Sequence, residues 1–192
     1  MPKRLADDWA ALRLEDRIEP GVRVLFVGIN PGVRSAQTGH HFAGPSNRFW
    51  KLLFASGLVP EPVTWMDDDR LPEFGFGITN LVARPSPGID DLKPAEYIAG
   101  WKILEKKIDV YRPEVIALVG VTAYRAIRPL VEGATQEQAV RGATRPIVVG
   151  FQPVRVHGAR IFVLPNPSGR NAHYSYGDMV AAFSALEQAL RA

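Results

Sequence analysis

Apolar runs alternate with amphipathic stretches along almost the whole chain, and this alternation limits the fold more than any other feature. Strands are expected near 22–29, 76–82, 114–120, 146–150 and 160–164, and helices near 47–57 and 94–110, from about Thr122, and from Asp178 to Leu190. Strands and helices that follow one another in this order build α/β folds. The pattern predicts a three-layer α/β/α sandwich with a central, mostly parallel sheet of four to five strands.

The length and composition favour one domain. The chain has 192 residues, of which 46% are hydrophobic, so it can bury a substantial core. We therefore expect a single domain over 1–192, with about 1–20 as an N-terminal extension. The stretch from Glu132 to Arg145 has the weakest pattern and is interpreted as a surface excursion.

Cysteine content, hydropathy and charge exclude some functions. The chain has no cysteine, which excludes disulfides, thiolate nucleophiles and cysteine-ligated metal centres. No long apolar run or leader-like segment is visible, so we expect a soluble intracellular protein. A net charge of +3 and a pI near 9.3 suit a nucleic-acid partner, and they also suit many other proteins.

An asparagine follows the first expected strand directly. The motif is GINPG at 28–32, and a similar block, LPNPSGR at 164–170, follows the expected strand at 160–164. Polar residues just beyond parallel strands are where α/β folds build sites. The two loops therefore predict one shared cleft, with Asn30 at its centre.

The amide of Asn30 can donate and accept hydrogen bonds, but it has no ionisable proton. It can orient a water or a substrate edge, and it cannot act as a strong base. A turn asparagine that binds only local backbone is the alternative. A nucleotide-binding enzyme is a further alternative, but GINPG lacks both the ending of a P-loop and a complete GxGxxG fingerprint.

The next loop carries the sequence TGHHFAGPSNRFW at 38–50. Phe42 lies there among small residues, where an aromatic ring can form a pocket wall and stack on a base, or can belong to the core. His40 and His41 have no metal-ligand spacing with His157 or His173, so no metal site is expected.

These blocks together resemble the mismatch-specific uracil-DNA and thymine-DNA glycosylase family, within the uracil-DNA glycosylase superfamily. The blocks are GINPG, TGHHFAGPSNRFWK, GFGITNLVAR at 75–84 and LPNPSGR, in the order and at the spacing of the family. The resemblance extends from about Val22 to the last helix.

The resemblance implies roles for four pocket residues. Asn30 would position the hydrolytic water, and the flipped base would stack on Phe42. Backbone groups near Ile29 and Phe42 would contact the base edge, and the amide of Asn80 could bind the pyrimidine. The alternative for Asn80 is a residue that only ends a strand.

The same resemblance places the DNA wedge in the second loop. Asn166, Ser168, Gly169 and Arg170 would contact the duplex, with Arg170 filling the space that the extruded nucleotide leaves. Arg170 could instead bind only a phosphate. Further candidates for phosphate contacts are Arg34, Arg48, Lys51 and Arg84.

Two acids near the expected cleft could assist the asparagine. Asp90 and Asp91 follow the strand that carries Asn80, and Asp91 is the candidate general base. Aspartates at such positions more often cap a helix.

The resemblance implies a monofunctional DNA glycosylase, which excises uracil and related pyrimidines from double-stranded DNA without metal or cofactor. Uracil in a G·U pair should react faster than thymine, because it is the better leaving base. The alternative is a non-catalytic module that binds mismatches or damaged bases on the same scaffold. We expect a monomer without a membrane partner, in the cytoplasm and associated with a bacterial nucleoid.

Overall fold

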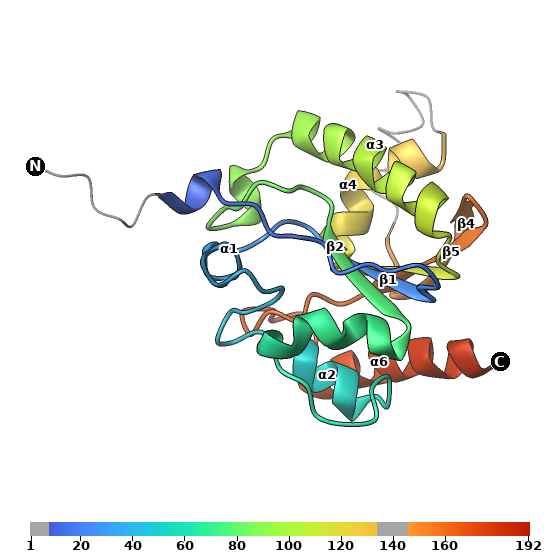
Figure 1. Cartoon of the computed structure of the whole chain (residues 1–192). Helices are drawn as coiled ribbons and strands as arrows, with labels where there is room; N and C mark the ends of the chain where they lie inside the picture. Colours follow the sequence, from blue (N-terminus) through green and yellow to red (C-terminus); the bar gives the residue numbers. More distant parts are fainter. Residues whose placement is uncertain (1–7, 134–145) are drawn as a thin grey trace, which may run out of the picture.

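The computed structural model describes residues 8–133 and 146–192. Within them a five-stranded sheet has the order β2-β1-β3-β5-β4 (Figure 1). The strands are β1 (Val24–Gly28), β2 (Phe76–Asn80), β3 (Val115–Val119), β4 (Gly150–Val156) and β5 (Ala159–Leu164). The first three and β5 run parallel, and β4 runs antiparallel to β5.

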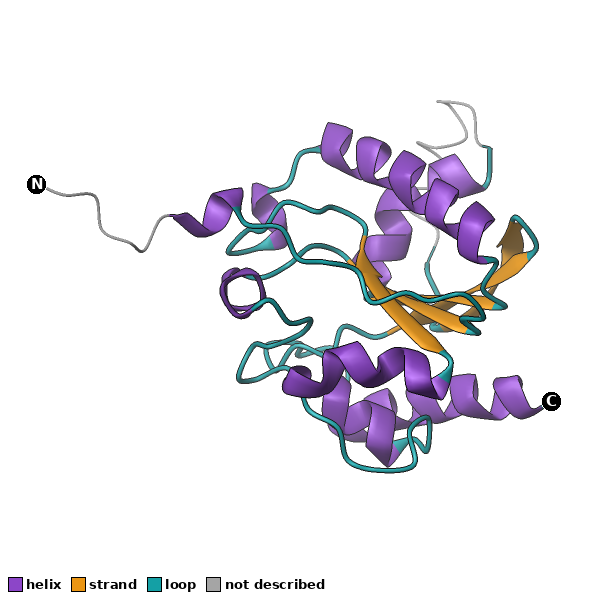
Figure 2. Cartoon of the chain, viewed as in Figure 1, coloured by secondary structure: helices purple, strands orange, loops and turns teal. Residues whose placement is uncertain are grey.

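Helices cover both faces of the sheet, so the predicted three-layer sandwich is confirmed (Figure 2). One face carries α3 (Pro94–Tyr111) and α4 (Val121–Val131), and the other carries α2 (Phe49–Ala55) and α6 (Tyr176–Arg191). Shorter helices are η1 (Asp8–Ala11), α1 (Val33–Thr38), η2 (Trp65–Phe74) and η3 (Ile89–Asp91).

The central strand β1 divides its side chains between two cores. Val24 and Phe26 pack with α2 and α6, whereas Leu25 and Val27 pack with α3 and α4. Successive side chains of a strand point to opposite faces, so a strand covered on both faces is apolar throughout. This explains why the apolar run is recognisable in the sequence.

The strand expected near 146–150 is wrong in position. The strand β4 begins at Gly150, and its exposed and half-buried residues alternate up to Val156. It lies at the sheet edge and forms a hairpin with β5, with an irregular register between Phe151 and Arg155. An edge strand with a bulge tolerates Pro153, which in a sequence argues against a strand. The excursion predicted for 132–145 falls largely on 134–145, outside the described residues.

The segment interpreted as an N-terminal extension is part of the fold where it is described. Arg17 and Ile78 pair through both backbone hydrogen bonds, at 3.0 and 2.8 Å. Asp16 Oδ2 lies 2.5 Å from Lys107 Nζ of α3, and Asp16 Oδ1 accepts from Thr79 Oγ1 of β2 at 2.5 Å. These contacts fasten the segment across β2.

The described helices include none that is both long and apolar enough to cross a membrane.

The four parallel strands all end at the same edge of the sheet, and the loops that leave this edge carry GINPG, the end of GITN and LPNPSGR. The shared cleft is therefore expected there.

Candidate active site

A cavity of about 200 Å³ opens at this edge of the sheet. Its lining comes from the ends of β1, β2, β3 and β5, from the loop before α2, and from the N-terminal segment, α1 and η3. The lining residues are Leu14, Ile29, Asn30, Pro31, Gly32, Ser35, His41, Phe42, Gly44, Asn47, Asn80, Ile89, Val119 and Asn166. The predicted pocket residues Ile29, Asn30, Phe42 and Asn80 thus meet in one cavity.

The amide of Asn30 is held from its nitrogen side. Nδ2 donates to Ser86 Oγ at 2.8 Å, to the Arg84 carbonyl at 3.1 Å and to the Pro31 carbonyl at 3.2 Å. All three partners are acceptors, so the orientation of the amide is fixed. Among the described residues no donor reaches Asn30 Oδ1, which therefore remains available to accept a hydrogen bond from a water in the cavity.

Phe42 forms a wall of the cavity in a strained conformation. Its ring stacks on Phe49, with centroids 4.3 Å apart and planes 28° from parallel. Its φ is +50°, a left-handed conformation that costs a non-glycine residue about 1–2 kcal/mol. Within the described part of the chain, the N–H and C=O of Phe42 itself have no hydrogen-bond partner. Both groups can therefore contact a ligand.

Asn80 lies beside His41 at the end of β2. Its Nδ2 is 3.4 Å from His41 Nδ1, while His41 Nε2 is 2.9 Å from the Glu15 carbonyl. A carbonyl only accepts, so Nε2 carries a proton. Burial lowers the pKa of His41, because the charged imidazole would lose its hydration. The neutral ring then accepts from Asn80 and turns the other amide atom, Oδ1, away from itself.

Gly28 makes room for both side chains. A Cβ at this position would lie 2.6 Å from Asn80 Oδ1 and 3.3 Å from Phe42 Cζ. Real Cβ atoms do not approach an oxygen that closely, so only glycine lets the asparagine and the ring meet here. The first glycine of GINPG thus serves packing at the cavity, not phosphate binding.

The predicted wedge loop is ordered by its own polar groups. Asn166 Oδ1 accepts from the Ser168 N–H at 3.0 Å, and Ser168 Oγ accepts from the Arg170 N–H at 3.3 Å. Gly169 packs on Ser46, where a Cβ would lie 2.8 Å from the Ser46 carbonyl oxygen. Arg170 is exposed, and its guanidinium has no partner among the described residues. The loop therefore presents this side chain to solvent.

Asp90 and Asp91 do not line the cavity. Both are exposed in η3, and Asp91 Oδ2 accepts from the Gly88 N–H at 3.2 Å, as a capping residue does. The structure therefore does not bring Asp91 together with Asn30. Its role as a general base stays a prediction without geometric support.

The basic residues predicted to contact DNA phosphates fall into two groups. Arg84 binds Glu96 through two nitrogens, at 2.7 and 3.0 Å, and this pairing lowers the pKa of Glu96 to about 2. Arg34 donates to the Ala43 carbonyl and lies over the Trp65 ring. The side chains of Arg48 and Lys51 have no polar partner among the described residues, so they are the better candidates.

Sequence reasoning missed three parts of the site. Ser86 holds Asn30, His41 orients Asn80, and the N-terminal segment supplies Leu14 and the Glu15 carbonyl. The serine of RPSPG lies in a stretch interpreted as a rigid turn, and its burial is the missing signal. No group of three acidic or histidine side chains in the described residues could hold a metal ion.

A model of the family described as the uracil DNA glycosylase superfamily matches residues 15–191. The chain belongs to the uracil DNA glycosylase superfamily. Membership supports a hydrolase activity on the N-glycosidic bonds of DNA, and the matched range includes the described N-terminal segment from Glu15 onward.

A solved structure supports the fold of this superfamily. The chain is similar to a solution NMR structure of a candidate uracil DNA glycosylase from Methanosarcina acetivorans, with a TM-score of 0.59. The two sequences are 17% identical, and the match covers 92% of this chain and 98% of the other. At that identity the likeness concerns the arrangement of sheet and helices.

Proposed function

We propose that the protein is a monofunctional DNA glycosylase that extrudes uracil from duplex DNA and hydrolyses its N-glycosidic bond, with G·U pairs as the preferred substrate. The observation that carries the proposal is the state of the Asn30 amide. Its nitrogen is bound to three acceptors, and its oxygen is available beside Phe42 and Asn80 in the same cavity.

The reaction needs little from the side chains beyond orientation. A water held by Asn30 Oδ1 attacks C1′ of the sugar while the bond from C1′ to the base breaks. The base leaves with the bonding electron pair, and the water loses one proton to solvent. The N–H of Phe42, which has no partner among the described residues, can stabilise the charge that develops on the base. No lysine belongs to the described cavity lining, which favours hydrolysis over a Schiff-base mechanism.

Asn80 supports the preference for uracil. Because His41 binds Nδ2 of this amide, Oδ1 is the atom that remains to accept from a base. Uracil and thymine carry an N–H at ring position 3, whereas cytosine has an unprotonated nitrogen there. Thymine should react more slowly than uracil, because its methyl group makes it the poorer leaving base.

The extrusion of the base is assigned to the loop that carries Arg170. Its backbone is ordered by internal hydrogen bonds, and Arg170 lines a neighbouring hollow that shares Asn166 with the cavity. A guanidinium can stack in the space left by the nucleotide. One cavity and one wedge suffice for one lesion, so we propose that the protein acts as a monomer. We also propose that it acts in the cytoplasm of a bacterial cell.

The test uses labelled duplexes with one G·U, A·U, G·T or G·C pair, in chelator, followed by alkali to convert abasic sites into breaks. The G·U duplex should be cleaved fastest. Asn30→Ala should slow its single-turnover rate by about 100-fold or more, a loss typical of one positioned polar group. Gln152→Ala is the control, since this amide also donates to two carbonyls but lies in β4, outside the cavity.

Other outcomes separate the alternatives. Cleavage that survives Asn30→Ala but disappears in Asp91→Asn would assign the chemistry to the aspartate. Tight binding of a mismatched duplex without cleavage of any duplex would indicate the non-catalytic module. Equal rates on G·U and G·T would contradict the leaving-base argument.

A further inference from the structure

Asp68 is a buried carboxylate for which the proposed reaction has no use. It lies in η2, its side chain is 0% exposed, and it does not line the cavity. Three donors reach it: the His41 N–H at 2.8 Å, His40 Nδ1 at 2.9 Å and Arg17 Nε at 3.4 Å. A buried charge is tolerated only with such compensation, so the donors and the carboxylate depend on one another.

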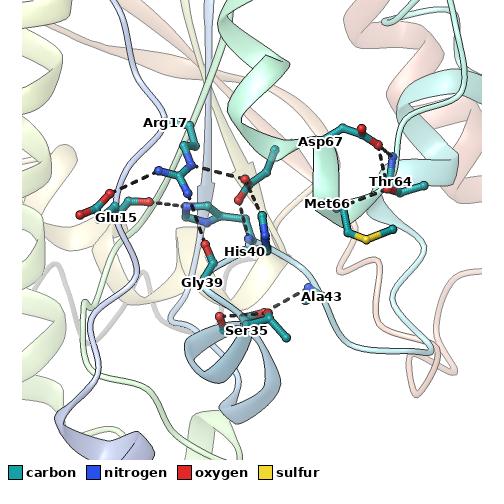
Figure 3. Close-up of polar contacts among 12 residues, drawn as sticks. Glu15, Arg17, Ser35, Gly39, His40, Ala43, Thr64, Met66 and Asp67 are labelled. Carbon is teal, nitrogen blue, oxygen red and sulfur yellow. Dashed lines mark hydrogen bonds and ion pairs between the residues drawn. The ribbon is translucent and has the colours of Figure 1, made fainter.

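The three donors either lie in the loop that leads into Phe42 or bind that loop. His40 and His41 precede it directly, and Arg17 also donates to the Gly39 carbonyl at 3.3 Å. Figure 3 shows Arg17, Gly39 and His40 close together, with Glu15 of the N-terminal segment beside them. Asp68 thus fastens the loop of 39–41 to both η2 and the N-terminal segment.

The other side of Phe42 is held separately. The Ala43 N–H donates to Ser35 Oγ at 3.1 Å, and the Ala43 carbonyl accepts from Arg34 at 2.8 Å (Figure 3 shows the first contact). Trp50 Nε1 donates to the His41 carbonyl at 3.1 Å. The N–H and C=O of both His41 and Ala43 therefore have hydrogen-bond partners, whereas those of Phe42 have none within the described part of the chain. This arrangement holds Phe42 at its φ of +50°.

We infer that Asp68 is a positioning residue that holds Phe42 in its left-handed conformation and so presents the ring and the unpartnered backbone groups of Phe42 to the flipped base. The inference rests on the proposed glycosylase function. Asp68 acts through the His41 N–H and touches neither the base nor the water.

The geometry requires a carboxylate at this position. Oδ2 accepts from the His41 N–H, and Oδ1 accepts from His40 and Arg17. An asparagine offers one oxygen and one NH₂ group. In either orientation its NH₂ would face the backbone N–H of His41 or the guanidinium of Arg17, both of which can only donate. Asp68→Asn therefore leaves at least one of these donors facing an NH₂ group and weakens the anchor, with almost no change in volume.

The experiment compares Asp68→Asn with Asp67→Asn. Asp67 is the neighbouring carboxylate in η2, but it accepts from the N–H and the hydroxyl of the cap residue Thr64, and within the described residues it makes no hydrogen bond to 39–43 (Figure 3). Asp68→Asn should lower the single-turnover rate on a G·U duplex by about 100-fold, because small displacements of a positioning group have effects of that size. Asp67→Asn should stay within about twofold, and both should bind the abasic product duplex like the unmodified protein.

A double-mutant cycle separates positioning from a merely structural role. If Asp68 acts through Phe42, then Asp68→Asn should change the rate by about twofold or less in a Phe42→Ala background. An equal loss in both backgrounds, or no loss in either, would overturn the inference. Where Asp68→Asn does not fold, Arg17→Gln replaces it, since it removes the guanidinium that reaches Asp68 from a partly exposed position and should show the same dependence on Phe42.

Amide hydrogen exchange tests the same contact without activity. The His41 amide should be protected in the unmodified protein and in Asp67→Asn, and should lose protection in Asp68→Asn. Unchanged protection in Asp68→Asn would also overturn the inference. If the unmodified protein cleaves no duplex while this protection pattern holds, the proposed function fails and the anchoring role of Asp68 stands.

Discussion

Ser86 is buried against the amide that the reaction needs. Its Oγ accepts from Asn30 and donates to the Gly88 carbonyl, and it is the nearest of the three acceptors that hold Nδ2. Ser86→Ala removes this acceptor and leaves the Pro31 and Arg84 carbonyls in place. We expect the single-turnover rate to fall by about tenfold, as for the loss of one neutral hydrogen bond. Ser56→Ala, another buried serine, which lies outside the cavity, should leave the rate unchanged.

His41 should make stability depend on pH. Its pKa is lowered from the ordinary value of 6.5, chiefly because it is buried. Below pH 6.5 the unfolded chain therefore takes up a proton more readily than the folded protein, and the free energy of unfolding falls as the pH falls. Urea denaturation between about pH 7.5 and 5.0 measures this. His41→Gln should flatten the dependence, whereas His173→Gln, at an exposed position, should retain it.

At the scale of elements, Gly100 brings α3 against the end of β2. A Cβ at this glycine would lie 2.0 Å from the Leu81 carbonyl oxygen, a backbone atom that cannot move without moving Asn80. Gly100→Ala should therefore destabilise the protein by about 3 kcal/mol or more. Gly177 of α6 is exposed, and among the described residues a Cβ there would meet only Ser175 Oγ, at 3.7 Å, so Gly177→Ala should stabilise the protein by about 0.5 kcal/mol. Denaturant unfolding of both variants measures the difference.

The elements with a long, regular pattern could be predicted from the sequence, and the others could not. The apolar run of β1 and the helical pattern of α3 indicate their positions within a few residues. The edge strand β4 was misplaced because it contains Pro153, which in a sequence argues against a strand. The helix η2 carries a proline and a kink at Asp67, so it has no clear helical period.

Some residues of the candidate site could likewise be predicted from the sequence, and others could not. Residues in strand-end motifs, such as Asn30 and Asn80, could be predicted because parallel strands bring their ends together. The residues that hold them could not, because Ser86 reaches Asn30 and His41 reaches Asn80 across long stretches of chain, as Asp68 in turn reaches His41. Their signal is burial of a polar group, which a single sequence does not contain.

At the scale of the whole molecule, the basic residues near the cavity divide into those that hold the protein together and those available to DNA. The Arg48 N–H donates to the Pro167 carbonyl of the wedge loop, which places Arg48 beside that loop, and its side chain has no polar partner among the described residues. Arg84, by contrast, is bound to Glu96 and to the Asp91 carbonyl, while its own carbonyl holds Asn30. The two arginines should therefore affect different steps.

Arg48→Ala should weaken binding to any duplex and lower the slope of log affinity against log salt by about one, as expected for one lost phosphate contact. Arg84→Ala should leave that slope unchanged and reduce the single-turnover rate, because the loop that holds Asn30 loses its tie to α3. Titrating both variants with matched G·C duplex at several salt concentrations measures the slopes. A lower slope in Arg84→Ala would mean that Arg84 leaves Glu96 to bind phosphate when DNA is present, and the ion pair would then be a feature of the free protein only.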